Sequence, residues 1–81
     1  LPSRQQTYFK KACESEQNPK LRMVLIKMLS HFHVPGMEEQ IGVLWDFGAY
    51  PEAISVICHS GGWAVKESWW PRVLERMSTL Q

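Results

Sequence analysis

Apolar residues recur at helical spacing along the whole chain, and no stretch alternates between apolar and polar residues with a period of two. The pattern is clearest after Asn18, which is suited to cap a helix, with Pro19 at the first helical position. Pro35 and Gly36 mark the end of this helix. Its predicted inner stripe steps by three and four residues and consists of Leu21, Val24, Leu25, Met28, Leu29 and Phe32.

Three further segments before residue 60 have the same periodicity. The segment from Ser3 to Glu16 is predicted to be a helix with Tyr8, Phe9, Ala12 and Cys13 on one face. A helix from Met37 to Phe47 would turn inward Met37, Ile41, Leu44 and Trp45. After a break at Gly48, a short helix from Pro51 to His59 would bury Ala53, Ile54 and Ile57.

The last helix is predicted to begin near Ser68, a suitable N-cap residue, because Pro71 is tolerated in a first turn. Gly61 and Gly62 predict a turn before it. Its inner stripe would consist of Trp70, Val73, Leu74 and Met77. Short helices joined by turns of a few residues predict a compact all-α bundle, with residues 1–81 forming a single domain.

Length, composition and charge narrow the class of protein. The 81 residues suffice for one small domain, and 44% apolar with 21% charged residues exclude disordered, collagen-like and coiled-coil classes. A net charge of +1 argues against a direct nucleic-acid binder. No apolar run approaches the roughly 20 residues that cross a bilayer, and no signal-peptide pattern opens the chain. We therefore expect a soluble cytoplasmic protein without membrane contact.

Two cysteines and three histidines are the candidates for reactive or metal-binding groups. Cys13 and Cys58 are predicted to be buried thiols of a cytosolic protein, because disulfide-stabilised small domains usually carry about four to eight cysteines. A zinc site needs ligands at paired short spacings, which His31, His33 and His59 do not provide together with these cysteines. No nucleophile, phosphate-binding or metalloprotease motif is present. We expect no metal, no cofactor and no enzymatic activity.

The tryptophans and the distribution of charge point instead to contacts with other proteins. Trp45 and Trp70 fall on predicted inner stripes and are expected to pack in the core. Consecutive helical residues point about 100° apart, so Trp69 or Trp70 would lie at the edge of the core, where tryptophan often anchors interfaces. The first two predicted helices are mainly basic and the middle of the chain is mainly acidic. This fits either ordinary solvated faces or opposite patches suited to association.

Several landmarks resemble a known family. The run Glu38–Ile41, followed by Gly48 and a short helix with Ala53 and apolar Ile54, Val56 and Ile57, resembles the middle of a caspase recruitment domain. The segment Lys66–Leu74 resembles the fifth helix of that domain, above all in cytosolic RNA-helicase receptors of the RIG-I-like type. The resemblance implies a six-helix Greek-key bundle of the death-fold superfamily, of which the helices predicted here account for five.

A relative of these domains would be a non-catalytic module for homotypic protein–protein interaction in innate immune or apoptotic signalling. The implied partner is another such domain or a copy of this one, and the helicase receptors also contact ubiquitin chains in antiviral signalling. Docking would use complementary charged helix faces. The candidate protein-binding residues are the acidic Glu38, Glu39 and Asp46, the basic Lys10, Lys11 and Arg22, and Lys66, Trp69 and Arg72 near the surface of the fifth helix.

A second interpretation rests on the segment 48–54, with the sequence GAYPEAI, which looks like the boundary between helices of a tetratricopeptide repeat. It would make the chain a helical scaffold that binds a peptide or a single protein partner. No period of about 34 residues is present, and about three repeats are needed for a stable array. An unrelated helical adaptor is a third possibility, and an RNA-binding bundle is disfavoured by the near-neutral charge.

Overall fold

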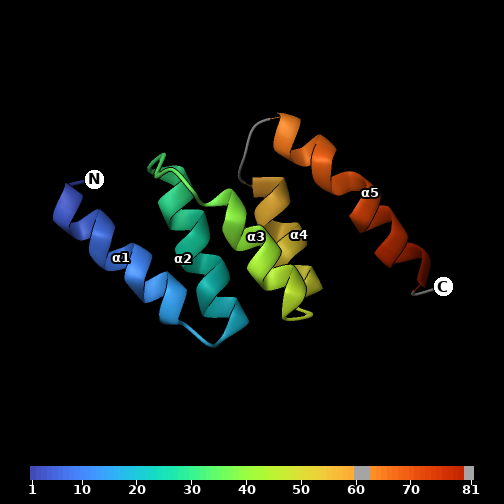
Figure 1. Cartoon of the computed structure of the whole chain (residues 1–81), viewed down its shortest axis with the longest axis horizontal. Helices are drawn as coiled ribbons and strands as arrows, with labels where there is room; N and C mark the ends of the chain where they lie inside the picture. Colours follow the sequence, from blue (N-terminus) through green and yellow to red (C-terminus); the bar gives the residue numbers. More distant parts are fainter. Residues whose placement is uncertain (60–62, 80–81) are drawn as a thin grey trace.

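Five α-helices make up the part of the chain that the computed structural model describes, which is residues 1–59 and 63–79 apart from the side chains of 63 and 64 (Figure 1). They are α1 (Ser3–Ser15), α2 (Pro19–His31), α3 (Glu38–Asp46), α4 (Tyr50–His59) and α5 (Trp63–Thr79). No described residue lies in a strand, so the all-α fold predicted from the sequence is confirmed. The turn predicted at Gly61 and Gly62 lies outside the described residues.

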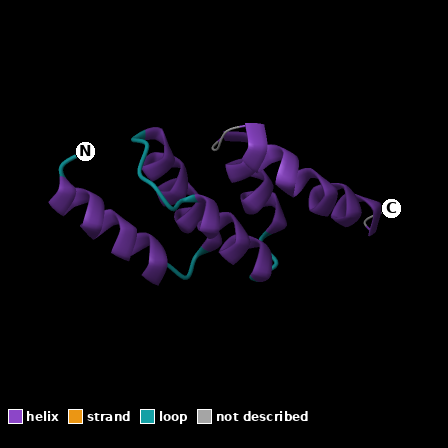
Figure 2. Cartoon of the chain, turned by 45° about the horizontal axis from the view of Figure 1, so that its top comes forward, coloured by secondary structure: helices purple, strands orange, loops and turns teal. Residues whose placement is uncertain are grey.

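The helices are arranged side by side in an elongated slab, with α1 at one end and α5 at the other (Figures 1 and 2). Helix α1 packs against α2, α2 packs against both α3 and α4, and α4 packs against α3 and α5. Helices α1 and α5 lie at opposite ends of the slab, whose Cα atoms extend over 45 × 27 × 14 Å. Each end helix is therefore packed on one side and leaves its other side open.

The core lies where α2, α3 and α4 meet. The largest fully buried side chains are Ile26, Leu29, Cys13, Ile41, Leu44, Val56 and Ile57. Ala53 of α4 is also fully buried. Full burial of one Leu or Ile side chain contributes roughly 1.5–3 kcal/mol. In a domain this small, these few side chains are the main source of stability.

Helices α2 and α3 end in the same hydrogen-bonded turn, in which a residue with positive φ stops the helix. After α3, Gly48 has a φ of 78°, and its N–H donates to the carbonyl of Trp45 at 2.9 Å. The N–H of Ala49 donates to the carbonyl of Leu44 at 3.0 Å. After α2, His33 takes the equivalent position with a φ of 59°, which few residues other than glycine adopt. The turn after α3 brings the end of α3 close to the start of α4.

The start of α2 agrees with the sequence prediction, but its inner face differs. Asn18 caps the helix as predicted, since its side chain accepts hydrogen bonds from two backbone N–H groups of the first turn. Leu21, Val24 and Phe32 of the predicted stripe are 54%, 55% and 48% exposed. The buried face is turned by about 100° and consists of Arg22, Ile26 and Leu29. Because α2 carries apolar residues on more than one side, its periodicity alone does not select the side that packs.

Helix α5 also differs from the prediction, because it begins before Ser68 and contains Pro71 in its interior. The hydroxyl of Ser68 donates to the backbone carbonyl three residues earlier instead of capping the helix. An internal proline removes one helical hydrogen bond, so the aromatic packing of α5 has to offset that loss. At the end of the predicted inner stripe, Leu74 and Met77 are 68% and 51% exposed.

Candidate protein-binding site

Three aromatic rings and two arginine side chains form a connected cluster where α3, α4 and α5 meet. This aromatic–arginine cluster consists of Trp45, Tyr50, Trp69, Arg72 and Arg76. The ring centroid of Trp45 lies 4.9 Å from that of Tyr50, edge to face, and 5.4 Å from that of Trp69. The Arg72 guanidinium lies 4.5 Å from the centroid of Trp69. The Arg76 guanidinium lies 4.1 Å from the centroid of Tyr50.

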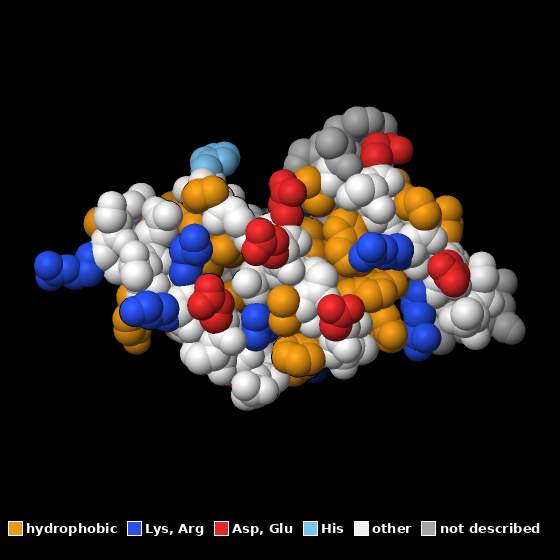
Figure 3. Space-filling view, in the orientation of Figure 1, with side chains coloured by type: hydrophobic (Ala, Val, Ile, Leu, Met, Phe, Trp, Pro, Cys, Tyr) orange, Lys and Arg blue, Asp and Glu red, His pale blue; other side chains and the backbone are white. Residues whose placement is uncertain are grey.

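The local structure explains why these side chains meet. Trp45 lies in the last turn of α3 and Tyr50 is the first residue of α4, so the tight turn at Gly48 places the two rings side by side. The three members from α5 are spaced by three and four residues, which puts them on one helix face. In Figure 3, apolar side chains gather between α3 and α5, and basic side chains lie over them.

The two arginines lie on one face of α5, each over a different aromatic ring, although their charges repel each other. Residues four apart on a helix are neighbours, so the charges of Arg72 and Arg76 disfavour one another by roughly 0.2–0.5 kcal/mol. Each guanidinium stacks on a ring, which stabilises it by about 0.5–1 kcal/mol at an exposed site. A guanidinium held over a ring keeps the planar set of N–H donors that pairs with a carboxylate. The cluster can therefore bind an anion.

An apolar pocket of about 410 Å³ lies beside the cluster, between the start of α4 and the end of α5. It is lined by Tyr50, Pro51, Ile54, Arg76 and Met77. The two helices diverge toward the C-terminal end of α5 (Figure 1). Two of the lining residues also belong to the aromatic–arginine cluster, so the pocket and the cluster form one continuous site.

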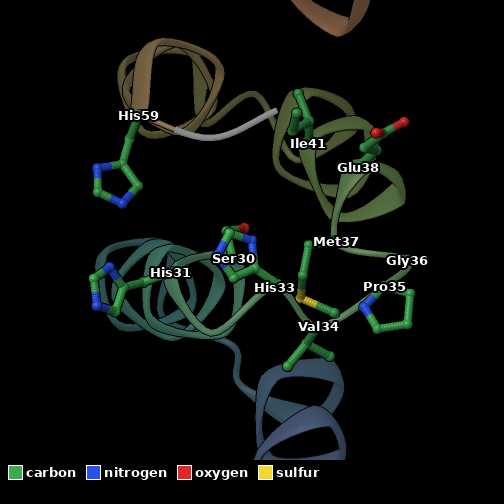
Figure 4. A pocket seen from close by; sticks show the side chains of 10 residues that line it. All are labelled: Ser30, His31, His33, Val34, Pro35, Gly36, Met37, Glu38, Ile41 and His59. Atoms are coloured by element: carbon green, nitrogen blue, oxygen red, sulfur yellow. The ribbon is translucent and has the colours of Figure 1, made fainter. Parts of the chain in front are cut away.

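A second cavity, of about 630 Å³, lies between the end of α2, the start of α3 and the end of α4. Figure 4 shows His31 at the end of α2, His33 in the turn after α2 and His59 at the end of α4 around it, while the carboxylate of Glu38 points away. The hydroxyl of Ser30 in its wall has no hydrogen-bond partner. Among the described residues, no three His, Cys, Asp or Glu side chains are placed to hold a metal ion. The aromatic–arginine cluster has the more specific binding chemistry.

Arg22 was predicted to belong to an exposed basic face, but it is buried at the junction of α1, α2 and α3, with 5% of its surface exposed. Its guanidinium donates to the carbonyls of Glu14 and Glu16, both at 3.2 Å, and to Oε1 of Gln40 at 2.7 Å. The end of α1 leaves such carbonyls without helical partners, and Arg22 satisfies them. The prediction was wrong because arginine is rarely buried and the sequence does not show its partners.

The other predicted residues of the two charged faces lie on α1 and α3. Glu38, Glu39 and Asp46 are exposed on α3. Residues seven apart on a helix share a face, so Glu39 and Asp46 point to the same side. Lys10 on α1 is half-buried and Lys11 is exposed. The acidic group is thus a real exposed feature of α3, whereas the basic group is reduced to two lysines.

On α5, the structure brings together two of the three predicted residues. Trp69 and Arg72 are in contact, while Lys66 is half-buried one turn earlier. The sequence interpretation missed Tyr50 and Arg76 as members of the site. A tryptophan followed at three and seven residues by arginines was the available signal, because this spacing aligns them on one helix face.

The two cysteines differ in burial, which corrects half of the sequence prediction. Cys13 is buried as predicted, and its Sγ lies 3.9 Å from Oε1 of Gln40 as a weak donor. Burial raises the pKa of the Cys13 thiol, although the nearby charge of Arg22 opposes this. Cys58, near the end of α4, is exposed, contrary to the prediction. Both cysteines are free thiols.

We expect one fast-reacting thiol per chain when the folded protein is titrated with an aromatic disulfide reagent. Cys58 should react at once, and Cys13 at least about tenfold more slowly, because its sulfur is shielded and its raised pKa lowers the thiolate fraction. The Cys58→Ser variant should lose the fast phase and Cys13→Ser should keep it. Two fast thiols in the folded protein would contradict the burial of Cys13.

Comparisons with known proteins place the chain in no family. A scan against protein-family models, a search of curated proteins and a search of solved structures each found no match. In the described part of the chain, no helix is long and apolar enough to span a membrane. The function therefore has to be inferred from the geometry of this chain.

Proposed function

We propose that this chain is a non-catalytic protein-binding domain that docks through side chains on its outer helix faces. The observation that carries this proposal is that large apolar side chains are exposed on both α2 and α5. Leu21 and Val24 are exposed on α2, and Leu74 and Met77 are exposed on α5. Apolar side chains that gather on an exposed surface usually mark a contact with another molecule.

The chemistry of the described side chains supports binding rather than catalysis. The aromatic–arginine cluster offers stacking, apolar contact and hydrogen-bond donors to an anion, which are means of recognition. Cys13, the thiol with the raised pKa, is buried against Gln40 and lines neither cavity. Two free thiols, one of them exposed, support a reducing cytoplasmic setting.

Two forms of this function follow from the two sequence resemblances. As a recruitment domain in innate immune or apoptotic signalling, the chain would dock homotypically, with Glu38, Glu39 and Asp46 as its acidic face. As a helical scaffold, it would bind a peptide or one protein partner. The slab arrangement favours the scaffold, because α1 and α5 lie at opposite ends, whereas a closed Greek-key bundle returns its first helix to the later ones.

Light scattering of the purified chain across protein and salt concentration separates the two forms. We expect a monomer at every concentration, as for a scaffold that binds another protein. A mass that grows with concentration and falls with added salt would favour homotypic docking instead. In that case Glu39→Lys, on the acidic face, should reduce the mass, and Glu67→Lys, an exposed control on α5, should not. A chain that binds neither itself nor any peptide would contradict the proposed function.

A further inference from the structure

We propose that the aromatic–arginine cluster and its pocket bind a short acidic segment of a partner protein. In the bound state an apolar side chain of that segment fills the pocket, and a neighbouring carboxylate pairs with Arg76 and Arg72. This inference rests on the proposed protein-binding function and names the chemistry of the partner. Three sets of observations carry it, namely the pocket, the unpaired arginine nitrogen and the occupied ring faces.

The pocket is shaped for an apolar side chain. Pro51 and Ile54 from α4 and Met77 from α5 line it, together with Tyr50 at the start of α4. Methionine is flexible, and an exposed Met77 can adjust to side chains of different shape. A leucine, isoleucine or phenylalanine that enters this pocket leaves water, which is favourable in proportion to the apolar area covered.

The arginine at the edge of the pocket lacks an acceptor. Nε of Arg76 is shielded from solvent and has no hydrogen-bond partner. A shielded donor without an acceptor is unfavourable, so a shift of the Arg76 side chain that presents this N–H to a ligand oxygen removes that cost. Arg72 lies one turn earlier on the same face and is held by Trp69. A carboxylate that pairs with both guanidiniums also relieves their mutual repulsion. Because each guanidinium already lies over a ring, its side chain is restricted before the ligand binds.

The same side chains suit a nucleic acid less well. Stacking of a base needs an open aromatic face, but Arg72 lies over the ring of Trp69 and Arg76 lies over the ring of Tyr50. Two arginines and a net charge of +1 provide few contacts to a phosphate backbone. The apolar pocket offers nothing to a sugar or a phosphate. An acidic protein segment therefore fits better.

A second copy of the chain is also a weaker candidate for the occupant. The chain carries an acidic residue beside an exposed aromatic residue at the end of α3, Asp46 and Phe47. The ring of Phe47, however, lies 5.8 Å from the guanidinium of Arg22 in its own molecule. To enter the pocket of another copy, this ring would have to give up that contact. A segment from a different protein has no such competing contact.

The test is selection of a random peptide library, displayed on phage, against the immobilised full chain. We expect the selected sequences to share an acidic residue one or two positions from a leucine, isoleucine, methionine or phenylalanine. A selected peptide, made with a fluorescent label, is then titrated with the chain and its binding is followed by anisotropy. Circular dichroism of every variant confirms that it is folded.

Four variants test whether the peptide occupies this site. Arg76→Gln should weaken binding at least about tenfold. Arg76→Lys should also weaken it, because lysine keeps the charge but loses the planar fork and the stacking. Arg72→Gln should have a smaller effect in the same direction. Arg4→Gln removes the same charge from an exposed position on α1 at the opposite end of the slab, and should change binding by less than about twofold.

Each other result overturns the inference in a recognisable way. Equal losses in Arg76→Gln and Arg4→Gln would mean that general charge attraction causes the binding. Selected peptides that lack acidic residues, or that bind Arg76→Gln normally, would place protein binding elsewhere and leave the proposed function intact. Self-association that is lost in Arg76→Gln would make a second copy the occupant. A library without binders would reject the acidic segment, and light scattering would then decide whether the homotypic form of the proposed function survives.

Discussion

The Arg22→Ala variant is expected to lose about 3 kcal/mol of unfolding free energy, because hydrogen bonds from a charged donor contribute roughly 1.5–3 kcal/mol and unpaired partners add a penalty. The substitution removes the donor to two carbonyls at the end of α1 and to Gln40 of α3. It also leaves a space in the junction of three helices. Urea denaturation followed by circular dichroism measures the loss. For a domain of this size, such a loss is a large fraction of the total stability.

Two further variants separate hydrogen bonding from packing at Arg22. Arg22→Met keeps most of the side-chain volume. If packing contributes to stability, this variant should lose less unfolding free energy than Arg22→Ala. If only the hydrogen bonds matter, the two variants should lose the same amount. In a double-mutant cycle, Arg22→Ala and Gln40→Ala should show a coupling free energy of roughly 1–2 kcal/mol, because the two side chains are in direct contact. Lys20→Ala, an exposed charge on the same helix, should change stability by less than about 0.5 kcal/mol. An Arg22→Ala variant as stable as this control would contradict the structural role of Arg22.

The sequence predicted the parts of the fold that depend on local signals. The start of α2 follows from Asn18 and Pro19, whose cap and restricted φ act within one turn. The end of α3 follows from Gly48, because its positive φ is readily available to glycine. Helix α4 begins one residue before the predicted start and ends at the predicted His59. In each case the residues that determine the boundary lie next to it in the chain.

The start of α5 was mispredicted because a local rule was overruled by packing. Pro71 is usually found in the first turn of a helix, which placed the predicted start at Ser68. In the structure α5 continues toward its N-terminus, and its aromatic and apolar side chains pack against the core, with Trp69 against Trp45 of α3. The energy of these contacts comes from residues far away in the sequence, and no property of the segment around Pro71 reveals it.

The candidate site was predicted in part for the same reason. Their position near the surface of the predicted fifth helix suggested Trp69 and Arg72 as contact residues, and the two side chains contact each other. Whether they bind a protein stays a prediction. Tyr50 joins them only through the turn after α3, and Arg76 only through its stacking on Tyr50. Such a site depends on how three helices are placed, which one-dimensional periodicity does not give.

Helix α2 offers the sharpest test of the packing, because it carries two leucines in contrasting environments. Leu29 is fully buried, whereas Leu21, on the same predicted stripe, is about half exposed. Truncation of a buried leucine to alanine costs about 2–5 kcal/mol, since it removes apolar contacts and leaves a cavity. Leu29→Ala should therefore destabilise the chain by about 3 kcal/mol, and Leu21→Ala by less than about 1 kcal/mol.

The comparison is matched, because both substitutions remove the same atoms from the same helix and change its intrinsic propensity equally. The difference in urea midpoint at equal m-value therefore measures packing alone. If Leu21→Ala and Leu29→Ala lose the same unfolding free energy, the stripe containing Leu21 and Val24 is covered in solution. Either a different packing of α2 or association of the chain would cover it. Light scattering of the wild-type chain at the same concentration distinguishes these two causes, since only association raises the mass. A large loss of unfolding free energy in Leu29→Ala but not in Leu21→Ala would indicate that the stripe containing Leu21 and Val24 is free to contact a partner, in keeping with the proposed protein-binding function.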